Sequence, residues 1–193
     1  MILPVIVLLV LSRKWKLNRI PSAWFLGAAG FFVTQILIRV PILTFLQTQD
    51  WFLTFSQNHA FAYVFSLAFT AGLFELIGRF AIAKLLSKKN LTYARSLAAG
   101  LGHGGIEAML LVGTAYINNI LYCLMINSGT FDTLISQAAA TGVDVTQLYT
   151  LRDSLIQTHP ALFLLAGLER ILAMTGHVAM SLMVCYGVAS GKP

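Results

Sequence analysis

The sequence predicts an all-α fold, namely a polytopic transmembrane helix bundle with four or five membrane helices. Hydrophobic residues make up 58% of the 193 residues and charged residues only 10%, whereas a soluble domain carries about 25% charged residues. The apolar residues also lie in long runs of the length that crosses a bilayer. This composition excludes a disordered chain, a coiled coil and an ordinary soluble enzyme.

Five apolar stretches follow one another, and we expect residues 1–193 to form a single transmembrane domain. The stretches cover residues 2–11, 22–46, 60–86, 96–126 and 160–189. The last four are long enough to span a bilayer with some tilt. The first reaches only about 15 Å, half of a bilayer core, so we expect a re-entrant piece or the end of a helix there.

Residues 127–159 form the only long polar segment of the chain. Apolar residues recur in it at roughly helical spacing, as at Leu148, Leu151 and Leu155. This spacing predicts one or two short helices that lie on the outer membrane surface.

The charges in the loops and near the ends of the apolar stretches predict the topology. Nine basic residues fall on one side of the membrane: Arg13, Lys14, Lys16, Arg19, Lys84, Lys88, Lys89, Arg95 and Lys192. The other side carries four aspartates and one basic residue, Arg152. The positive-inside rule therefore predicts a cytoplasmic C-terminus, with the lipid bilayer as a partner. It also accounts for the net charge of +6, and these short loops offer no surface for nucleic acid.

Six charged residues interrupt the apolar stretches, together with the histidines His103 and His177. The six are Arg39, Glu75, Arg79, Glu107, Glu169 and Arg170. A charge at the middle of a bilayer costs at least ~2.5–3.5 kcal/mol, so such residues face one another or a water-filled cavity. They are the strongest functional signal in the sequence.

Spacing and depth group five of these residues. Glu75 and Arg79 are four residues apart on one stretch, and His103 and Glu107 are four apart on the next, so each pair shares a helix face. Counted from the cytoplasmic ends of their stretches, these residues and His177 lie at similar depths. We therefore predict that three helices bring the five side chains together.

A carboxylate and a histidine around one water molecule form a general acid–base pair, and a metal ion can join them. Two histidines and one glutamate are a familiar zinc ligand set that leaves a position for water. The sequence leaves open whether a metal ion is bound. It also leaves open that Glu75 and Arg79 form only a structural ion pair, and that His177 is only an interhelical contact. No aspartate lies in an apolar stretch, which excludes an aspartyl mechanism.

Three motifs resemble those of the YhfC family of intramembrane metalloproteases. They are FELIGRF on one stretch, GLGHGGIEAMLL on the next and LERILAMTGHVAMS on the last. That family is similar in motif plan to the PrsW and CAAX-processing (CPBP) proteases. The resemblance covers nearly the whole chain, and GHGGIEA is its most specific part.

The resemblance implies a membrane protease core of the bacterial plasma membrane, in which glutamate and histidine activate a water molecule. It implies catalytic roles for Glu75, Arg79, His103, Glu107 and His177. Among these residues, His103, Glu107 and His177 are the implied metal ligands, with zinc as the candidate ion. The implied partner is a membrane-embedded peptide or protein substrate.

The chain departs from the family's motif plan beside Glu75, where Leu76 stands in place of a second glutamate. The chain also ends soon after His177, so we expect a truncated or divergent family member. The sequence therefore predicts an intramembrane protease that hydrolyses peptide bonds of membrane-anchored substrates. The alternative is a non-catalytic membrane protein, for binding, transport or scaffolding, whose polar cluster holds an ion or fixes helix packing.

Overall fold

The computed structural model describes residue 10, residues 20–88 and residues 91–191. All regular elements of these residues are helices, and four segments are long and apolar enough to cross a membrane. These segments are Ile20–Leu46, Ala60–Ser87, Tyr93–Asn127 and Pro160–Ser190. The predicted all-α transmembrane fold is confirmed, with boundaries within one helical turn of the predicted stretches. The predicted first stretch, residues 2–11, lies outside the described residues except for residue 10.

Contacts between residues divide the chain into two compact units. One unit combines Met1–Ala108 with Leu172–Pro193, and the other is Met109–Ile171. The expected single domain over residues 1–193 stays a prediction.

The first membrane segment combines α2 (Ile20–Phe31), the π-helical segment η1 (Phe32–Arg39) and α3 (Val40–Leu46). The N–H of Val40 donates to the carbonyl oxygen of Gln35, five residues earlier. Pro41 lies in the first turn of α3, directly after the π-helical segment. The π-helical turns were not predicted from the apolar pattern, and such turns often occur at functional sites.

A short helix, α4 (Asp50–Asn58), follows the first membrane segment and was not predicted. Its aromatic residues pack with one another and with the next helix: the Phe52 ring lies 6.3 Å from that of Phe55 and 5.7 Å from that of Tyr63, which belongs to the following helix. Aromatic residues of this kind are common where a membrane helix reaches the bilayer surface.

Two further helices complete the first unit together with the C-terminal part of α10 (Pro160–Ser190): α5 (Ala60–Ser87) and α6 (Tyr93–Glu107). Helix α5 buries a face near its C-terminal end, from Gly78 to Leu86. Helix α6 begins with a cap, because the hydroxyl oxygen of Thr92 accepts the N–H of Arg95 at 3.4 Å. Most residues of α6 from Arg95 to Gly105 are buried.

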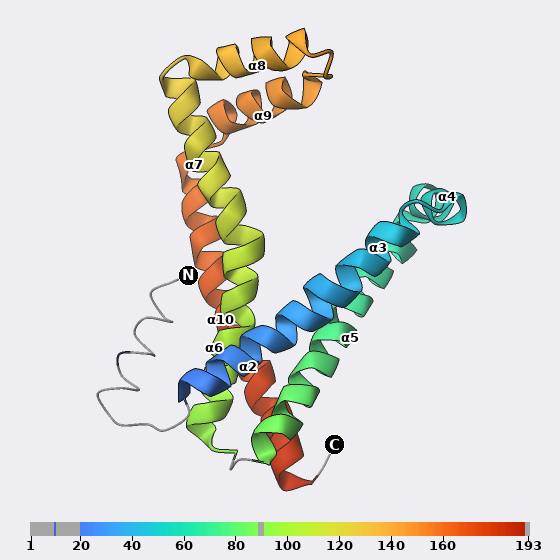
Figure 1. Cartoon of the computed structure of the whole chain (residues 1–193), viewed down its shortest axis with the longest axis vertical. Helices are drawn as coiled ribbons and strands as arrows, with labels where there is room; N and C mark the ends of the chain where they lie inside the picture. The colour runs from blue at the N-terminus through green and yellow to red at the C-terminus, as the bar shows by residue number, and fades with distance from the viewer. Residues whose placement is uncertain (1–9, 11–19, 89–90, 192–193) are drawn as a thin grey trace. The chain divides into compact units, whose positions relative to one another are not determined.

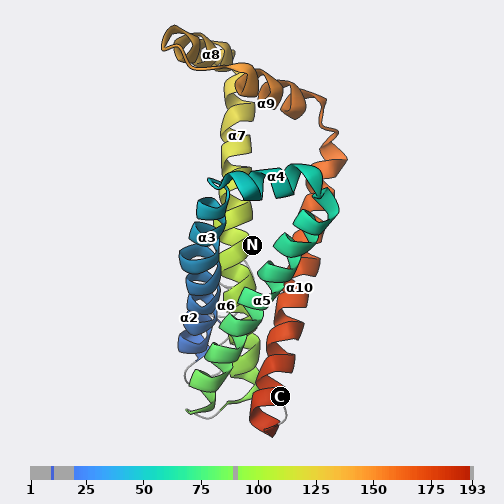
Figure 2. The ribbon, with the colours of Figure 1, turned by 90° about the vertical axis from the view of Figure 1, so that its right-hand side faces the viewer.

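Helices α2 and α6 lie side by side in close contact (Figure 1, Figure 2). A Cβ atom on Gly102 would lie 2.0 Å from the carbonyl oxygen of Trp24, and one on Gly27 would lie 2.0 Å from that of Ala99. Only glycine allows these backbones to approach so closely, which is how small residues pack helices in membranes. This contact fixes α6, and with it the position of His103.

The second unit contains most of η2 (Ala108–Gly113), α7 (Thr114–Asn127), α8 (Thr130–Ala140) and α9 (Thr146–Gln157). One or two short helices were predicted in residues 127–159, and the structure has two there, α8 and α9. The guanidinium of Arg152 on α9 donates to Asp132 of α8 at 2.9 Å and also contacts Asp153.

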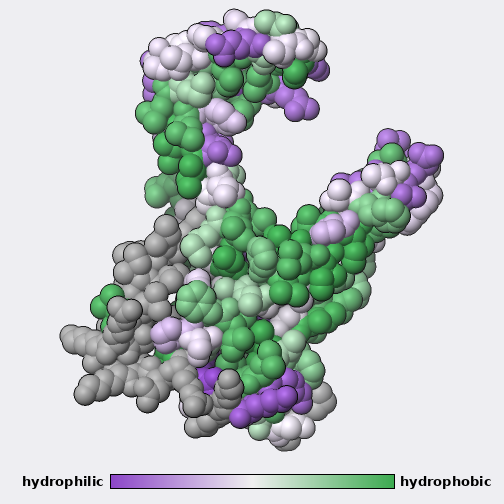
Figure 3. Space-filling model, viewed as in Figure 1, coloured by the Kyte–Doolittle hydropathy of each residue, from purple (hydrophilic) through white to green (hydrophobic). Residues whose placement is uncertain are grey.

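Hydrophobic side chains cover much of the visible surface along the membrane segments, whereas hydrophilic residues gather at α4 and along α8 and α9 (Figure 3). Large apolar residues such as Phe61, Leu172 and Tyr186 are more than two-thirds exposed. Such exposure is unusual on a soluble monomer and is expected of a surface in contact with lipid.

Candidate active site

Glu75 and Arg79 stand one turn apart on α5 and form an ion pair. The Nη1 atom of Arg79 donates to Oε2 of Glu75 at 2.8 Å. The Arg79 side chain is 4% exposed and that of Glu75 is 18% exposed. The predicted pairing of the two residues is therefore present in the first unit.

His103 projects from α6 toward the same carboxylate. Its Nε2 atom lies 3.8 Å from Oε2 of Glu75. The Nε2 atom is buried and has no hydrogen-bond partner among the described residues. The ring also packs edge-on against Phe31 of α2, with 5.2 Å between centroids. Because the polar atoms of buried side chains are almost always paired, an unpartnered nitrogen aimed at a carboxylate indicates room for a ligand.

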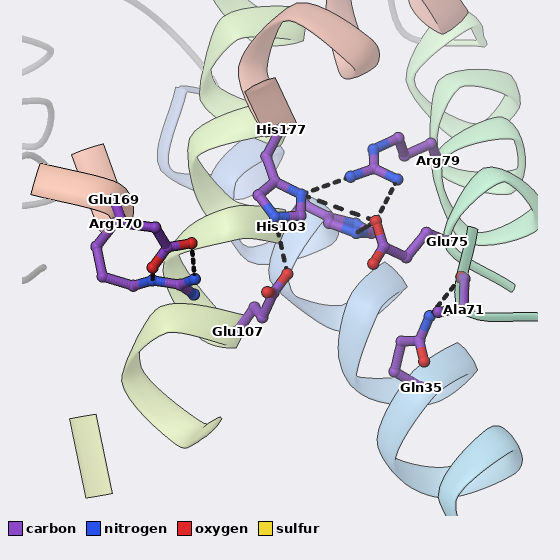
Figure 4. A network of polar contacts seen from close by, with 9 residues as sticks. All are labelled: Gln35, Ala71, Glu75, Arg79, His103, Glu107, Glu169, Arg170 and His177. Carbon is purple, nitrogen blue, oxygen red and sulfur yellow. Dashed lines mark hydrogen bonds and ion pairs between the residues drawn. The ribbon is translucent and has the colours of Figure 1, made fainter. Parts of the chain in front are cut away.

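His177 comes from the C-terminal part of α10 and joins both partners on α5. Its Nδ1 atom accepts a hydrogen bond from Nη2 of Arg79 at 2.6 Å and lies 3.8 Å from Oε2 of Glu75. Figure 4 shows these side chains pointing toward one another. Gly104 makes room for the ring, because a Cβ atom there would lie 2.9 Å from Cβ of His177.

Glu107 lies on the other side of the His177 ring. Its Oε2 atom is 2.9 Å from Nε2 of His177. The alignment of the two atoms does not meet the geometry of a hydrogen bond, so Oε2 of Glu107 is buried and has no hydrogen-bond partner in the part of the chain that the structure describes. All five predicted site residues therefore lie in one connected cluster of the first unit.

Three residues of the cluster could hold a metal ion. Glu75, His103 and His177 each offer one ligand atom within 4.8 Å of the other two. Ligands bound to zinc at about 2.1 Å lie roughly 3.4 Å apart in a tetrahedral site, close to the two 3.8 Å distances observed. The donor set and the unpartnered nitrogen of His103 fit a zinc ion. The sequence-based assignment of Glu107 as a ligand stays a prediction, because this group contains Glu75 in its place.

A small cavity adjoins the cluster, and Arg79 and His103 form part of its lining. It measures about 10 Å³, which is about the room that one water molecule needs. Ser181 and Cys185 of α10 also line it. The Nε atom of Arg79 is buried, and none of the described residues forms a hydrogen bond with it.

Gln35 supports α5 and was not identified from the sequence. Its Nε2 atom donates to the carbonyl oxygen of Ala71 at 2.8 Å, one turn before Glu75 (Figure 4). Arg39 donates to the carbonyl oxygen of Leu67 at 2.7 Å. The sequence did contain a signal for Gln35: it lies four residues before Arg39 in an apolar stretch, and both amide and charged side chains are rare inside membrane segments.

Glu169 and Arg170 belong to the second unit and form an ion pair with each other. Neither belongs to the group of three candidate ligands.

Comparisons with known proteins agree with the motifs. A family model described as YhfC intramembrane metalloprotease matches residues 1–193. The uncharacterized membrane protein YhfC of Bacillus subtilis (strain 168) is 32% identical over 193 residues, which are all of this chain and 72% of the relative. No solved structure matches the chain.

Proposed function

The chain belongs to the YhfC family, and from this premise we propose that it is an intramembrane protease of membrane-anchored substrates. The observation that carries the proposal is the group of Glu75, His103 and His177, whose ligand atoms lie within 4.8 Å of one another. Two imidazoles and one carboxylate, buried in membrane helices, form a costly arrangement that chemistry explains better than packing.

In this proposal Glu75, His103 and His177 hold a zinc ion. A bound zinc ion supplies Lewis acidity and lowers the pKa of a water molecule. Glu107 lies outside this group of three ligands, with its Oε2 atom 2.9 Å from Nε2 of His177, and it would accept a proton from the attacking water. The water oxygen forms a bond to the peptide carbonyl carbon, the C–N bond breaks, and Glu107 returns the proton to the leaving amine nitrogen.

The proposal includes the membrane and the orientation. We place the chain in a bacterial plasma membrane with its C-terminus in the cytoplasm. The basic residues between α5 and α6 support this orientation, since positive loops stay on the cytoplasmic side. Reporter fusions after residue 88 and after residue 142 should give cytoplasmic and external signals respectively, and the reverse pattern would contradict this orientation.

The proteolytic test uses the purified full chain in detergent with bacterial membrane proteins as substrates. Newly formed peptide N-termini inside membrane segments are labelled and identified by mass spectrometry. Glu75→Gln and His103→Ala should abolish these N-termini and bound zinc. Glu169→Gln is the matched control, since it also removes an intramembrane carboxylate, and it should retain both. Unchanged cleavage in Glu75→Gln and His103→Ala would overturn the proposal.

One observation favours a second candidate, in which the cluster only fixes helix packing. Arg79 already donates to both Glu75 and His177, which accounts for two of the three polar side chains without any ligand. In that case Glu75→Gln and His103→Ala would destabilise the fold, and neither the variants nor the natural chain would cleave or bind zinc.

A further inference from the structure

We propose that the guanidinium of Arg79 occupies the place of the zinc ion when the protein is metal-free. Its hydrogen bonds to Glu75 and His177 and a bound zinc ion would then exclude each other. Arg79 would thereby set the metal affinity of the site. This inference rests on the proposed function, because it concerns the zinc ion that Glu75, His103 and His177 would hold.

Arg79 uses the same ligand atoms that a metal ion would need. Its Nη1 donates to Oε2 of Glu75 at 2.8 Å, and its Nη2 donates to Nδ1 of His177 at 2.6 Å. An imidazole nitrogen has a single lone pair, so Nδ1 cannot accept a hydrogen bond and bind a metal ion at once. The other nitrogen of His177 faces Glu107 at 2.9 Å, which leaves Nδ1 as the atom directed at Glu75.

The positive charge of Arg79 also opposes the binding of a metal ion. A guanidinium stays protonated in proteins, so Arg79 cannot release these atoms by losing a proton. It lies at hydrogen-bond distance from two of the three candidate ligands, and there it would repel a divalent cation at close range. The metal ion therefore enters only when the guanidinium moves away.

The present position of Arg79 is not fully satisfied, and a small cavity adjoins its side chain. Within residues 20–88 and 91–191 its buried Nε atom has no hydrogen-bond partner, so these residues satisfy only part of the guanidinium. The cavity lined by Arg79 and His103 has room for about one water molecule, so it allows a small shift of the guanidinium but could not hold the whole group. When the side chain shifts, Arg79 gives up its hydrogen bonds to Glu75 and His177. Glu75 then has the zinc ion as its positive partner.

The test measures zinc affinity of the purified full chain in detergent, without any cleavage assay. The chain is first stripped with a chelator, and Zn²⁺ is then titrated in competition with a chromophoric chelator. We expect Arg79→Gln to bind Zn²⁺ at least tenfold more tightly than the natural chain. Arg79→Lys should lie between the two, because one ammonium cannot reproduce a planar fork that bonds two acceptors. It also serves as the second variant if Arg79→Gln does not fold.

Arg39→Gln is the matched control, since Arg39 is a membrane-embedded arginine whose hydrogen bonds go to Gln35, Leu67 and Thr70. It should leave zinc affinity unchanged. Equal or weaker zinc binding in the Arg79 variants would overturn the inference, as would the absence of zinc binding in every variant. A zinc-loaded natural chain that cleaves nothing would contradict the proposed protease but not the role of Arg79.

Discussion

The guanidinium of Arg79 on α5 donates a hydrogen bond of 2.6 Å to Nδ1 of His177 on α10. Because arginine can only donate, Nδ1 must be the acceptor, and the neutral ring carries its proton on Nε2. That nitrogen lies 2.9 Å from Glu107 on α6. One arginine therefore sets the tautomer of a histidine between two carboxylates, and the three helices of the cluster are connected through His177.

Glu107 and Glu75 should separate metal binding from cleavage. In Glu107→Gln the three candidate ligands remain, so zinc content should be retained while cleavage falls by about 100-fold or more, a typical loss for a general base. In Glu75→Gln both zinc and cleavage should be lost. Metal analysis and N-terminal mass spectrometry on the same preparations measure the two properties. Loss of zinc in Glu107→Gln would instead support the sequence-based assignment of Glu107 as a ligand.

The contact between α2 and α6 should be intolerant of a single methyl group. In Gly102→Ala the new Cβ would lie 2.0 Å from the backbone oxygen of Trp24, so the helices must separate. We expect a loss of about 3 kcal/mol or more of unfolding free energy, at the upper end of overpacking effects. Unfolding in mixed detergents measures it. Gly72→Ala is the control, because no other described part of the chain lies within 4 Å of its added Cβ. Equal stability of both variants would contradict this prediction.

Composition and the positions of charges were sufficient to predict most of the fold. Long apolar runs define membrane helices because a bilayer satisfies no backbone hydrogen bonds. The same signal could not show the π-helical turn around Gln35, which depends on local backbone hydrogen bonding rather than on hydropathy. It also missed α4, because a short helix with mixed residues carries too little periodicity to stand out.

The grouping of the five polar side chains was predicted from the sequence, but the contacts among them were not. Spacing on α5 paired Glu75 with Arg79, and the structure contains that ion pair. Spacing on α6 suggested that His103 and Glu107 act together, whereas the contact of Glu107 is with His177. Contacts between helices depend on how the helices cross and rotate, and a single sequence specifies neither.

Gly104 should matter for catalysis more than for stability. A Cβ atom on Gly104 would lie 2.9 Å from Cβ and 3.0 Å from Cγ of His177, so Gly104→Ala should push the ring from its place. A displacement of about 1 Å at a catalytic group can cost 100-fold in rate, so we expect cleavage to fall by 10-fold to 100-fold. Gly176→Ala is the control. It adds a methyl group at the residue before His177, and no other described part of the chain lies within 4 Å of that added Cβ. Equal cleavage by the two variants would show that the His177 position is not critical.

The start of α9 should depend on pH through Asp144, which lies outside the membrane segments. Its carboxylate accepts the hydroxyl of Thr146 at 2.6 Å and the backbone N–H of Thr146 at 2.9 Å. These hydrogen bonds hold the pKa of Asp144 below its ordinary value of 3.8. A lowered pKa means that the stabilisation is fully present above that ordinary value and is lost as the pH falls through the folded-state pKa. Hydrogen exchange of the first turn of α9, corrected for intrinsic rates, should therefore accelerate in acid. Asp144→Asn keeps an acceptor but cannot titrate, so its protection should not change with pH. The same acid response in Asp144→Asn would assign the effect to another group.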